Sequence, residues 1–279
     1  MKPRGNLLKK HPELLLLLFA ATASAQVADT SAWKHSGVAG VTATQVSYTD
    51  WAQGGENALA WTATLEGKSL YQVETIAWAN TYNFAYGTTK LGSQSIRKTD
   101  DKIDLASEFK YLLGVYINPY IAATFKTQFT TGYSYDALGA GTAISDFFDP
   151  AFLTQSAGAG YQPMPEVKTR LGAALREIVT SNYTNYAGGS KTKVEGGLES
   201  VTEVDTRIQE NLFLKAKLEL FAAFKTMDEV VVRSDNTLTA KISEYFSTNL
   251  NVQLIHEKAI STRTQVKQTI ALGFSYVLF

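Results

Sequence analysis

The chain has 279 residues, with 26 lysines and arginines, 26 aspartates and glutamates, 3 histidines and no cysteine. This balance of charge offers no basic patch for nucleic acid. The absence of cysteine excludes disulfides and a lipidated N-terminal cysteine. After residue 25 the apolar runs are too short for a transmembrane helix, which needs about 20 consecutive apolar residues.

The first 25 residues have the three parts of a secretory signal peptide. Basic residues in MKPRGNLLKK precede the apolar run from Leu14 to Ala21, and the small residues of Ala23-Ser24-Ala25 follow it. We therefore predict a signal peptide over 1–25, a short periplasmic segment over 26–36 and one domain over 37–279. Export places this domain in the outer membrane of a Gram-negative-type envelope.

From residue 37 onward, apolar and polar side chains alternate with a period of two. In NLFLKAKLELFAAF (211–224) all four leucines fall on one face and both lysines on the other, whereas a helix would spread the lysines around its surface. In chain order, the segments with this pattern cover 37–48, 57–71, 74–87, 100–113, 117–133, 151–160, 165–180, 194–208, 211–225, 229–242, 246–256 and 264–279.

These segments are longer than the usual strand of about 5–6 residues, but a tilted strand that crosses a membrane needs about ten. The connections alternate in length: 88–99, 134–150, 182–193 and 257–263 are long and polar, and those between them are short. This pattern predicts an all-β fold, a transmembrane antiparallel up-and-down β-barrel of about 12 strands. A soluble periplasmic β-sandwich is the alternative.

Aromatic residues near the strand ends are typical of the girdles that contact outer-membrane lipid. The aromatic residues assigned to girdles are Trp51, Trp61, Trp78, Tyr82, Tyr86, Tyr116, Tyr120 and Tyr133. The last strand, ALGFSYVLF, ends on Phe279, which is out of phase with the apolar face that ends at Leu278. Such a strand resembles the signal that the barrel-assembly machinery recognises.

If the apolar face of each strand contacts lipid, the charged face lines the lumen. The residues predicted to face the lumen are Lys102, Asp104, Glu108, Lys110, Lys126, Lys168, Arg170, Arg176, Glu195, Glu199, Glu203, Asp205, Lys215, Lys217, Glu219, Arg233, Asp235 and Lys241. A ring of one sign would give ion selectivity, but here the signs are mixed. We therefore favour pairing that braces the wall over selectivity, and a narrow pore stays open as an interpretation.

Motifs of hydrolases, nucleotide-binding proteins and metalloproteins are absent from the sequence. His256 near a strand end, with Ser261 or Glu257, is the one arrangement that could suggest an outer-membrane hydrolase, and a solvated rim residue is the simpler interpretation. The acid pairs Asp100-Asp101 and Asp146/Asp149 lack the regular spacing of a calcium site. We expect no enzymatic activity, no cofactor and no metal.

Three motifs carry a family resemblance. They are TDWAQGGENALAW (49–61), RKTDDKIDLASEFKY (97–111) and FKTQFTTGYSY (125–135). Together they resemble an uncharacterised outer-membrane β-barrel family, domain of unknown function 3078. The matching residues are Trp51, Gly54, Gly55, Asn57, Arg97, Lys98, Thr99, Asp100, Asp101, Thr127, Gln128, Phe129, Gly132 and Tyr133. The resemblance implies an outer-membrane barrel and supplies no activity or catalytic residue.

Gly54-Gly55 are expected at the tip of a hairpin, because the alternating residues after them indicate a strand and not the helix of a phosphate-binding loop. The leading functional hypothesis is a non-enzymatic narrow channel, or a structural barrel with a partner protein in the envelope. The hydrolase and the soluble sandwich are the alternatives.

Overall fold

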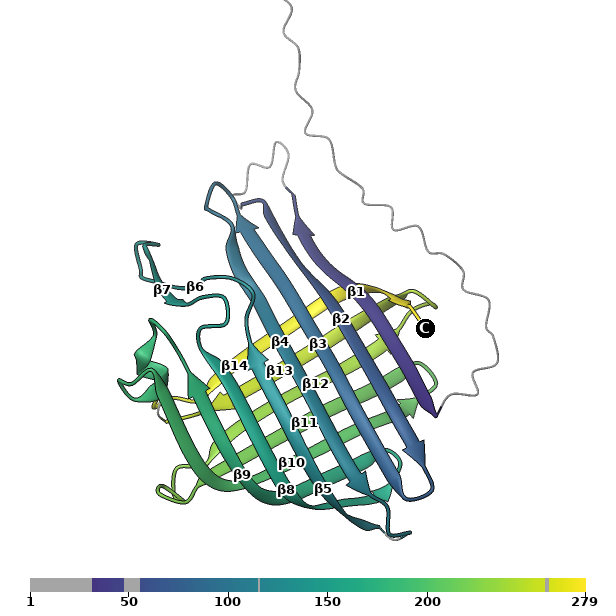
Figure 1. Ribbon diagram of the computed structural model, residues 1–279. Coiled ribbons are helices and arrows are strands. Elements are labelled where there is room, and N and C mark those ends of the chain that lie inside the picture. The colour runs from purple at the N-terminus through teal and green to yellow at the C-terminus, as the bar shows by residue number, and fades with distance from the viewer. Residues whose placement is uncertain (1–31, 48–55, 115, 259–260) are drawn as a thin grey trace, which may run out of the picture. The chain divides into compact units, whose positions relative to one another are not determined.

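The computed structural model describes residues 32–47, 56–114, 116–258 and 261–279 (Figure 1). The unit Ala32–Phe279 contains every strand within these ranges. The predicted signal peptide lies outside the described residues, as do Trp51, Gly54 and Gly55 of the first motif.

Twelve long strands of the described chain form one closed antiparallel barrel (Figure 1). Their bounds are β1 (Trp33–Val46), β2 (Ala58–Val73), β3 (Ile76–Leu91), β4 (Arg97–Tyr111), β5 (Ile117–Thr127), β8 (Ala151–Met164), β9 (Val167–Val179), β10 (Thr192–Gln209), β11 (Leu212–Ala223), β12 (Val231–Lys241), β13 (Phe246–His256) and β14 (Gln265–Val277). The long connection between β5 and β8 carries a separate hairpin, β6 (Gly132–Tyr135) with β7 (Gly141–Ser145), and a short 3₁₀ helix, η1 (Thr184–Ala187), follows β9.

The barrel closes where the first strand meets the last. β1 pairs with β14 from Val38↔Val277 to Ala43↔Leu272, whereas its ladder with β2 runs from Trp33↔Tyr71 to Val46↔Ala58. Closure excludes the β-sandwich, since a sandwich would leave sheet edges between two layers. The prediction of an up-and-down barrel of about 12 strands is therefore confirmed.

The strand boundaries differ from the predicted ones at a few ends. β1 begins at Trp33, before the predicted start of the barrel at residue 37. β5 ends at Thr127 and not at residue 133, because the side chain of Asp101 accepts hydrogen bonds from the backbone amides of Phe129 and Thr130 and turns the chain out of the barrel.

The two ends of the barrel have different connections. At one end, the loop end, the connections are 47–57, 92–96, 128–150, 180–191, 224–230 and 257–264. At the other, the turn end, they are 74–75, 112–116, 165–166, 210–211 and 242–245. Long loops at one end and short turns at the other are typical of outer-membrane barrels.

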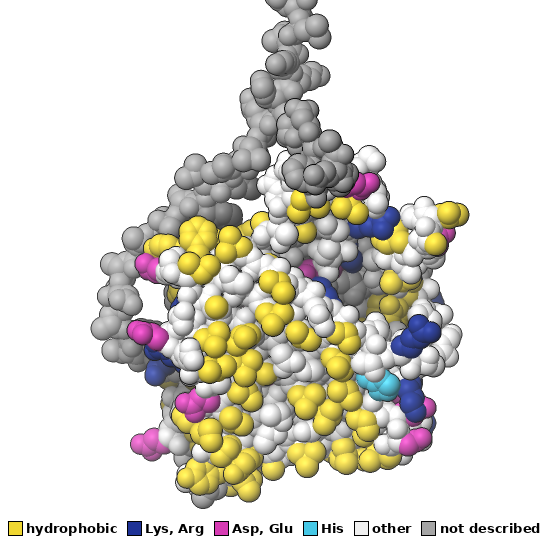
Figure 2. Space-filling model, turned by 180° about the vertical axis from the view of Figure 1, so that it is seen from behind, with side chains coloured by type: hydrophobic (Ala, Val, Ile, Leu, Met, Phe, Trp, Pro, Cys, Tyr) yellow, Lys and Arg dark blue, Asp and Glu magenta, His cyan; other side chains and the backbone are white. Residues whose placement is uncertain are grey.

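Many large apolar side chains are exposed on the outside of the barrel, and Figure 2 shows those of one face. Ile121 is 60% exposed, Leu171 58% and Ile270 71%. Each lies on the face of its strand that points away from the charged residues, since successive side chains alternate. Soluble proteins rarely expose so continuous an apolar surface, and a lipid-facing barrel wall does so on every strand. In the described part of the chain, no helix is long and apolar enough to cross a membrane.

Aromatic residues gather at the barrel ends. At the turn end the ring of Trp33 lies 5.3 Å from that of Tyr71 and 5.5 Å from that of Trp78. At the loop end the rings of Trp61 and Tyr86 are 6.0 Å apart.

The predicted girdle contains one wrong assignment and one residue of a different kind. Tyr120 is only 4% exposed and lies beneath the guanidinium of Arg170, 5.5 Å from its ring centroid, because it stands opposite the inward-facing Lys110. It is therefore a lumen residue. Tyr133 belongs to β6, which pairs with β7 in a hairpin separate from the barrel sheet.

Candidate functional site in the barrel lumen

Alternation along β9, β10 and β11 places acidic residues between two basic strands. Glu203 of β10 stands opposite Lys168 of β9 and Lys217 of β11. Asp205 stands opposite Lys215 of β11. Directly opposed residues point to the same face of a sheet, so these charges share the inner wall.

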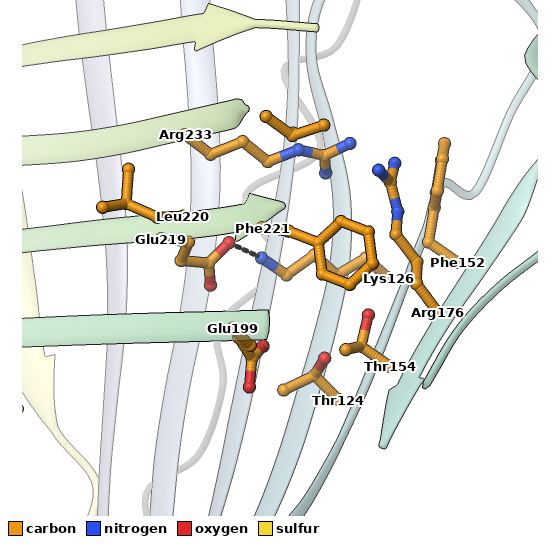
Figure 3. Close-up of a pocket in the computed structure, with 11 residues that line it drawn as sticks. Thr124, Lys126, Phe152, Thr154, Arg176, Glu199, Glu219, Leu220, Phe221 and Arg233 are labelled. Carbon is orange, nitrogen blue, oxygen red and sulfur yellow. Dashed lines mark hydrogen bonds and ion pairs between the residues drawn. The ribbon is translucent and has the colours of Figure 1, made fainter. Parts of the chain in front are cut away.

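The middle of the lumen is crossed by a group of ion pairs that we call the central group: Asp104, Lys126, Lys217 and Glu219. Lys126 of β5 donates to Glu219 of β11, and this bond spans the interior because β8, β9 and β10 lie between the two strands (Figure 3). Lys217 contacts Glu219 at 2.8 Å, and Lys126 lies 3.9 Å from Asp104.

A second group ties the wall together closer to the turn end. Arg170 of β9 lies 2.6 Å from Glu108 of β4 and 3.5 Å from Glu199 of β10. Lys110 also contacts Glu108, at 2.6 Å. Every one of these side chains is at least three-quarters buried, and each has a side chain of opposite charge within contact distance. Buried charges require such partners, because they have lost their hydration.

A third group lies at the loop end, around Glu257, the first residue after β13. The Oε1 atom of Glu257 accepts from Arg176 at 2.6 Å, and its Oε2 accepts from Arg233 at 2.9 Å. Burial raises the pKa of this carboxyl, but the two guanidinium charges outweigh it and hold the pKa of Glu257 below its ordinary value. The ring of Phe152 lies under both guanidiniums.

Sequence reasoning did not place Glu257 in the lumen. Alternation could have done so, because His256 stands opposite the outward-facing Val232 and the next residue must turn inward. The predicted strand ends at residue 256, one residue before Glu257.

The remaining predicted lumen residues lie toward the two ends. Lys215 contacts Glu66 of β2 at 2.7 Å near the turn end, and Lys102 contacts Asp235 of β12 at 3.5 Å near the loop end. Glu195 pairs with its strand neighbour Lys193 at 2.8 Å. The amino group of Lys241 lies 4.9 Å from the ring of Phe213.

Two cavities adjoin the central group. The larger, of about 390 Å³, is lined mainly by charged and polar residues: Thr99, Asp100, Asp101, Lys102, Ile103, Asp104, Lys126, Thr127, Phe152, Lys217, Glu219, Arg233, Ser234, Asp235, Gln253, Leu254, Ile255 and Lys267. The smaller, of about 50 Å³, lies between the arginines of the loop end and Glu199, Thr124 and Thr154 (Figure 3).

The wall formed by β13, β14, β1 and β2 is different in kind. Asn249 and Asn251 of β13 face inward, as do Gly40 and Gly273. A Cβ atom would lie 2.8 Å from the Thr64 hydroxyl at Gly40 and 2.6 Å from the Asn249 amide nitrogen at Gly273, so the glycines leave room for these two side chains. Short side chains therefore line most of this side of the lumen, with charged exceptions such as Glu66 of β2 and Lys267 of β14.

The family motif residues of β4 and of the 128–150 loop meet at the loop end. Asp101 accepts from Lys98 at 2.8 Å and from the amides of Phe129 and Thr130 at 2.6 and 2.9 Å. Gln128 donates to the carbonyl oxygens of Asp146 and Asp149, at 2.5 and 2.7 Å. These contacts form a clamp that fixes the long loop to the barrel.

The neighbouring motif residues and acids are also tied into the loops. Asp100 pairs with Lys267 of β14, and Gly132 begins β6. Asp149 accepts from Thr180 and from the amides of Ser181 and Asn182, which bind the 180–191 loop to the first one. Among the described residues, no group of three histidine, cysteine or acidic side chains is arranged to hold a metal ion.

The side chains considered for a hydrolase do not come together. His256 Nδ1 shares a hydrogen bond of 3.0 Å with the hydroxyl of Thr264. The hydroxyl of Ser261 donates to the carbonyl oxygen of Arg263 at 3.1 Å, and Glu257 is held by the two arginines. A hydrolase site needs hydrogen bonds that link a nucleophile, a base and an orienting acid in series. His256, Ser261 and Glu257 instead each bind a different partner.

Fold and lumen together define a transmembrane β-barrel with an ion-paired interior. The family described as "Protein of unknown function (DUF3078)" matches residues 43–133, which contain the first two motifs and all but the last two residues of the third. This match confirms the family resemblance. No curated protein matches the chain.

Several solved structures have a similar fold. The translocator domain of the autotransporter NalP from Neisseria meningitidis is 12% identical, with 87% of this chain and 86% of that one covered and a TM-score of 0.37. An outer membrane channel from Pseudomonas putida F1 is also 12% identical, with coverage of 91% and 99% and a TM-score of 0.40. The toluene transporter TodX from Pseudomonas putida is 8% identical, with coverage of 87% and 88% and a TM-score of 0.31. Likeness at this level concerns the fold alone.

Proposed function

We propose that the protein is a narrow, weakly selective channel for small polar solutes. The observation that carries this proposal is the cavity of about 390 Å³ beside the central group, which is lined mainly by charged and polar side chains. On its wall Lys102 is 40% exposed, whereas Lys126 is 22% exposed and Asp104 only 9%. Lys215 near the turn end is 62% exposed, which marks a wet vestibule there. A polar cavity next to a buried group of ion pairs is what a narrow channel with a constriction requires.

The chemistry of the constriction indicates which solutes would pass. Lys126 and Lys217 balance Asp104 and Glu219, so a solute meets both signs of charge at one level. Single-sign rings select ions of one charge, and a balanced group does not. A barrel of twelve strands is also intermediate between small filled barrels and wide porins. Small neutral or zwitterionic solutes fit this lumen better than large or strongly charged ones.

Planar-bilayer recording of the refolded protein tests the proposal. We expect small conductance steps with a reversal potential near zero in a potassium chloride gradient, because neither sign of charge dominates. The double variant Lys126→Ala/Glu219→Ala removes the bridge across the lumen as a pair and should raise the conductance. Absence of steps in both proteins would exclude the channel and leave a structural barrel that serves a partner protein of the envelope.

The variant Glu66→Ala/Lys215→Ala is the matched comparison. It removes an ion pair of the same type, but from the vestibule at the turn end, where water already surrounds both side chains. Its conductance should change less than that of the Lys126/Glu219 variant. A larger change at the vestibule pair would place the constriction elsewhere.

The proposed location is the outer membrane of a Gram-negative-type envelope, reached by signal-peptide-directed export. The apolar barrel exterior and the short turns at one end support it. We further propose that β14, with Leu272, Phe274 and Tyr276 on its outer face, is recognised by the barrel-assembly machinery. Recovery in the outer-membrane fraction with heat-modifiable gel mobility tests the location, and loss of both on removal of residues 272–279 tests the recognition.

A further inference from the structure

Two arginines at the loop end of the lumen converge on a single carboxylate. Arg176 of β9 and Arg233 of β12 come from strands that are not neighbours, and their guanidinium groups point toward one another beside Phe152 (Figure 3). Glu257 gives one oxygen to each of them. This is a two-point carboxylate site, built from the wall and occupied by a side chain of the connection that follows β13.

The guanidiniums are held in place by contacts other than Glu257. Arg176 lies 5.6 Å from the ring centroid of Phe152 and 5.7 Å from that of Phe221, and Arg233 lies 5.2 Å from that of Phe152. Stacking of this kind orients a guanidinium and desolvates it. The arginines are therefore preorganised to bind an anion, with only 6% of the Arg176 side chain exposed.

The nearby carboxylates are engaged elsewhere. Glu219 is shared by Lys126 and Lys217, and Glu199 contacts Arg170. Glu257 thus supplies the one carboxylate that both arginines contact, and buried positive charge without a counter-charge is costly. If the carboxylate of Glu257 leaves, another anion is required in its place.

The backbone around Glu257 does not depend on its carboxylate. The amide of Ser261 donates to the Glu257 carbonyl oxygen at 2.9 Å, and His256 bonds to Thr264 across the base of the connection. The side chain can therefore leave the arginines while the turn keeps its own hydrogen bonds.

We propose that Arg176 and Arg233 form a binding site for small apolar carboxylates, which enter by displacing Glu257. Phe152 and Arg233 also line the larger cavity, of about 390 Å³, together with Leu254 and Ile255, which gives room beside the arginines for a ligand with a flat or branched apolar body. Glu257 is the built-in competitor that keeps the site filled in the absence of ligand. The proposal does not require the lumen to conduct.

Benzoate binding to the refolded full-length barrel, measured by calorimetry, tests this site, with neutral benzamide as the shape control. Glu257→Gln removes the competing charge, and its affinity for benzoate should rise by about tenfold or more over that of the unaltered chain. Benzamide affinity should stay the same in both. The added substitution Arg233→Gln should abolish the gain.

Glu66→Gln is the matched control, because it removes a lumen carboxylate that pairs with Lys215 near the turn end, away from the arginine pair. It should leave benzoate affinity at the level of the unaltered chain. Equal benzoate affinity in the Glu257→Gln variant and the unaltered chain, or a gain that survives the loss of Arg233, would overturn the proposal.

If Glu257→Gln fails to show the heat-modifiable mobility of a folded barrel, Glu257→Asp replaces it. The shorter carboxylate keeps the charge but cannot reach both guanidiniums equally, so benzoate affinity should rise by a smaller factor. An unchanged affinity in this variant would equally overturn the site. Bilayer recording is a separate measurement, so a barrel that binds benzoate without conducting would contradict only the channel.

Discussion

The lumen has two walls that follow the same alternation and use different side chains. The charged wall, formed by β4, β5 and β8–β12, carries the central group and both arginine groups. The polar wall, formed by β13, β14, β1 and β2, carries mainly asparagines, threonines and glycines, and the charged residues Glu66 and Lys267 on it pair with the other wall. Long charged side chains reach across the barrel and fill its interior, and short ones leave room beside them.

The comparison teaches how a barrel of this size can be braced without filling its whole interior. Ion pairs across the lumen stabilise the barrel only where the partners are fully matched, because each buried charge loses its hydration. Most of them join two strands of the charged wall, and only Lys215–Glu66 and Lys267–Asp100 among the described ion pairs reach the polar wall. The polar wall then needs few desolvated groups.

The largest loss of stability is expected from Glu219→Gln in the charged wall. Lys126 and Lys217 would lose the carboxylate that they share, and we expect the free energy of unfolding to fall by about 3 kcal/mol, the lower end for a broken buried ion pair. Urea unfolding of the barrel in lipid vesicles measures it. Glu66→Gln, in the exposed pair with Lys215, should cost less than about 1 kcal/mol. Equal losses of unfolding free energy in the two variants would show that the central group and the pair in the vestibule contribute alike to stability.

A smaller effect is expected on acidification at the loop end of the same wall. The pKa of Glu257 is held below its ordinary value, so its stabilising effect is complete above that ordinary value and is lost as the pH falls through the lowered pKa. The unaltered chain should therefore lose more unfolding free energy between neutral and strongly acidic pH than Glu257→Gln does. If the unfolding free energies of the two proteins change equally with pH, the arginines do not hold this carboxylate.

The smallest effect is expected on the polar wall. Asn251 donates to the carboxylate of Asp235 and the hydroxyl of Thr237, each at 2.8 Å, so Asn251→Ala should cost about 1 kcal/mol in urea unfolding. Thr64→Ala removes a weaker contact, 3.5 Å from the Gly40 carbonyl oxygen, and should change stability by less than about 0.5 kcal/mol. If Asn251→Ala costs as much unfolding free energy as Glu219→Gln, the two walls contribute equally to the stability of the barrel.

Strands and lumen chemistry differ in how far the sequence predicts them. Alternation is local, so it gives the twelve strands and the charged face of each one directly. The pairing of Lys126 with Glu219 is not local, because four ladders of hydrogen bonds separate their strands around the barrel. Which charge meets which across the interior depends on strand tilt and stagger, and neither can be read from one strand at a time.

The family motifs illustrate a different limit. Lys98, Asp101 and Gln128 stand out in the sequence as polar residues without an evident ligand or reaction. In the structure they clamp the 128–150 loop to the barrel. The sequence could not show this, since the carboxylate and the amides that it binds are brought together only when the chain leaves β5.

The junction of β1 with β14 has a consequence for assembly. Its ladder extends only from Val38 to Ala43 on the first strand, and it joins the two ends of the domain. Every other barrel ladder links strands that are closer in sequence, so their hairpins can form early, whereas this contact carries the largest entropic cost of closure. The ladder between β1 and β14 should therefore be the last to pair during folding and the first to open in urea. A cross-link engineered between Thr42 and Gly273, which face each other there, would slow unfolding more than the same cross-link inside any hairpin.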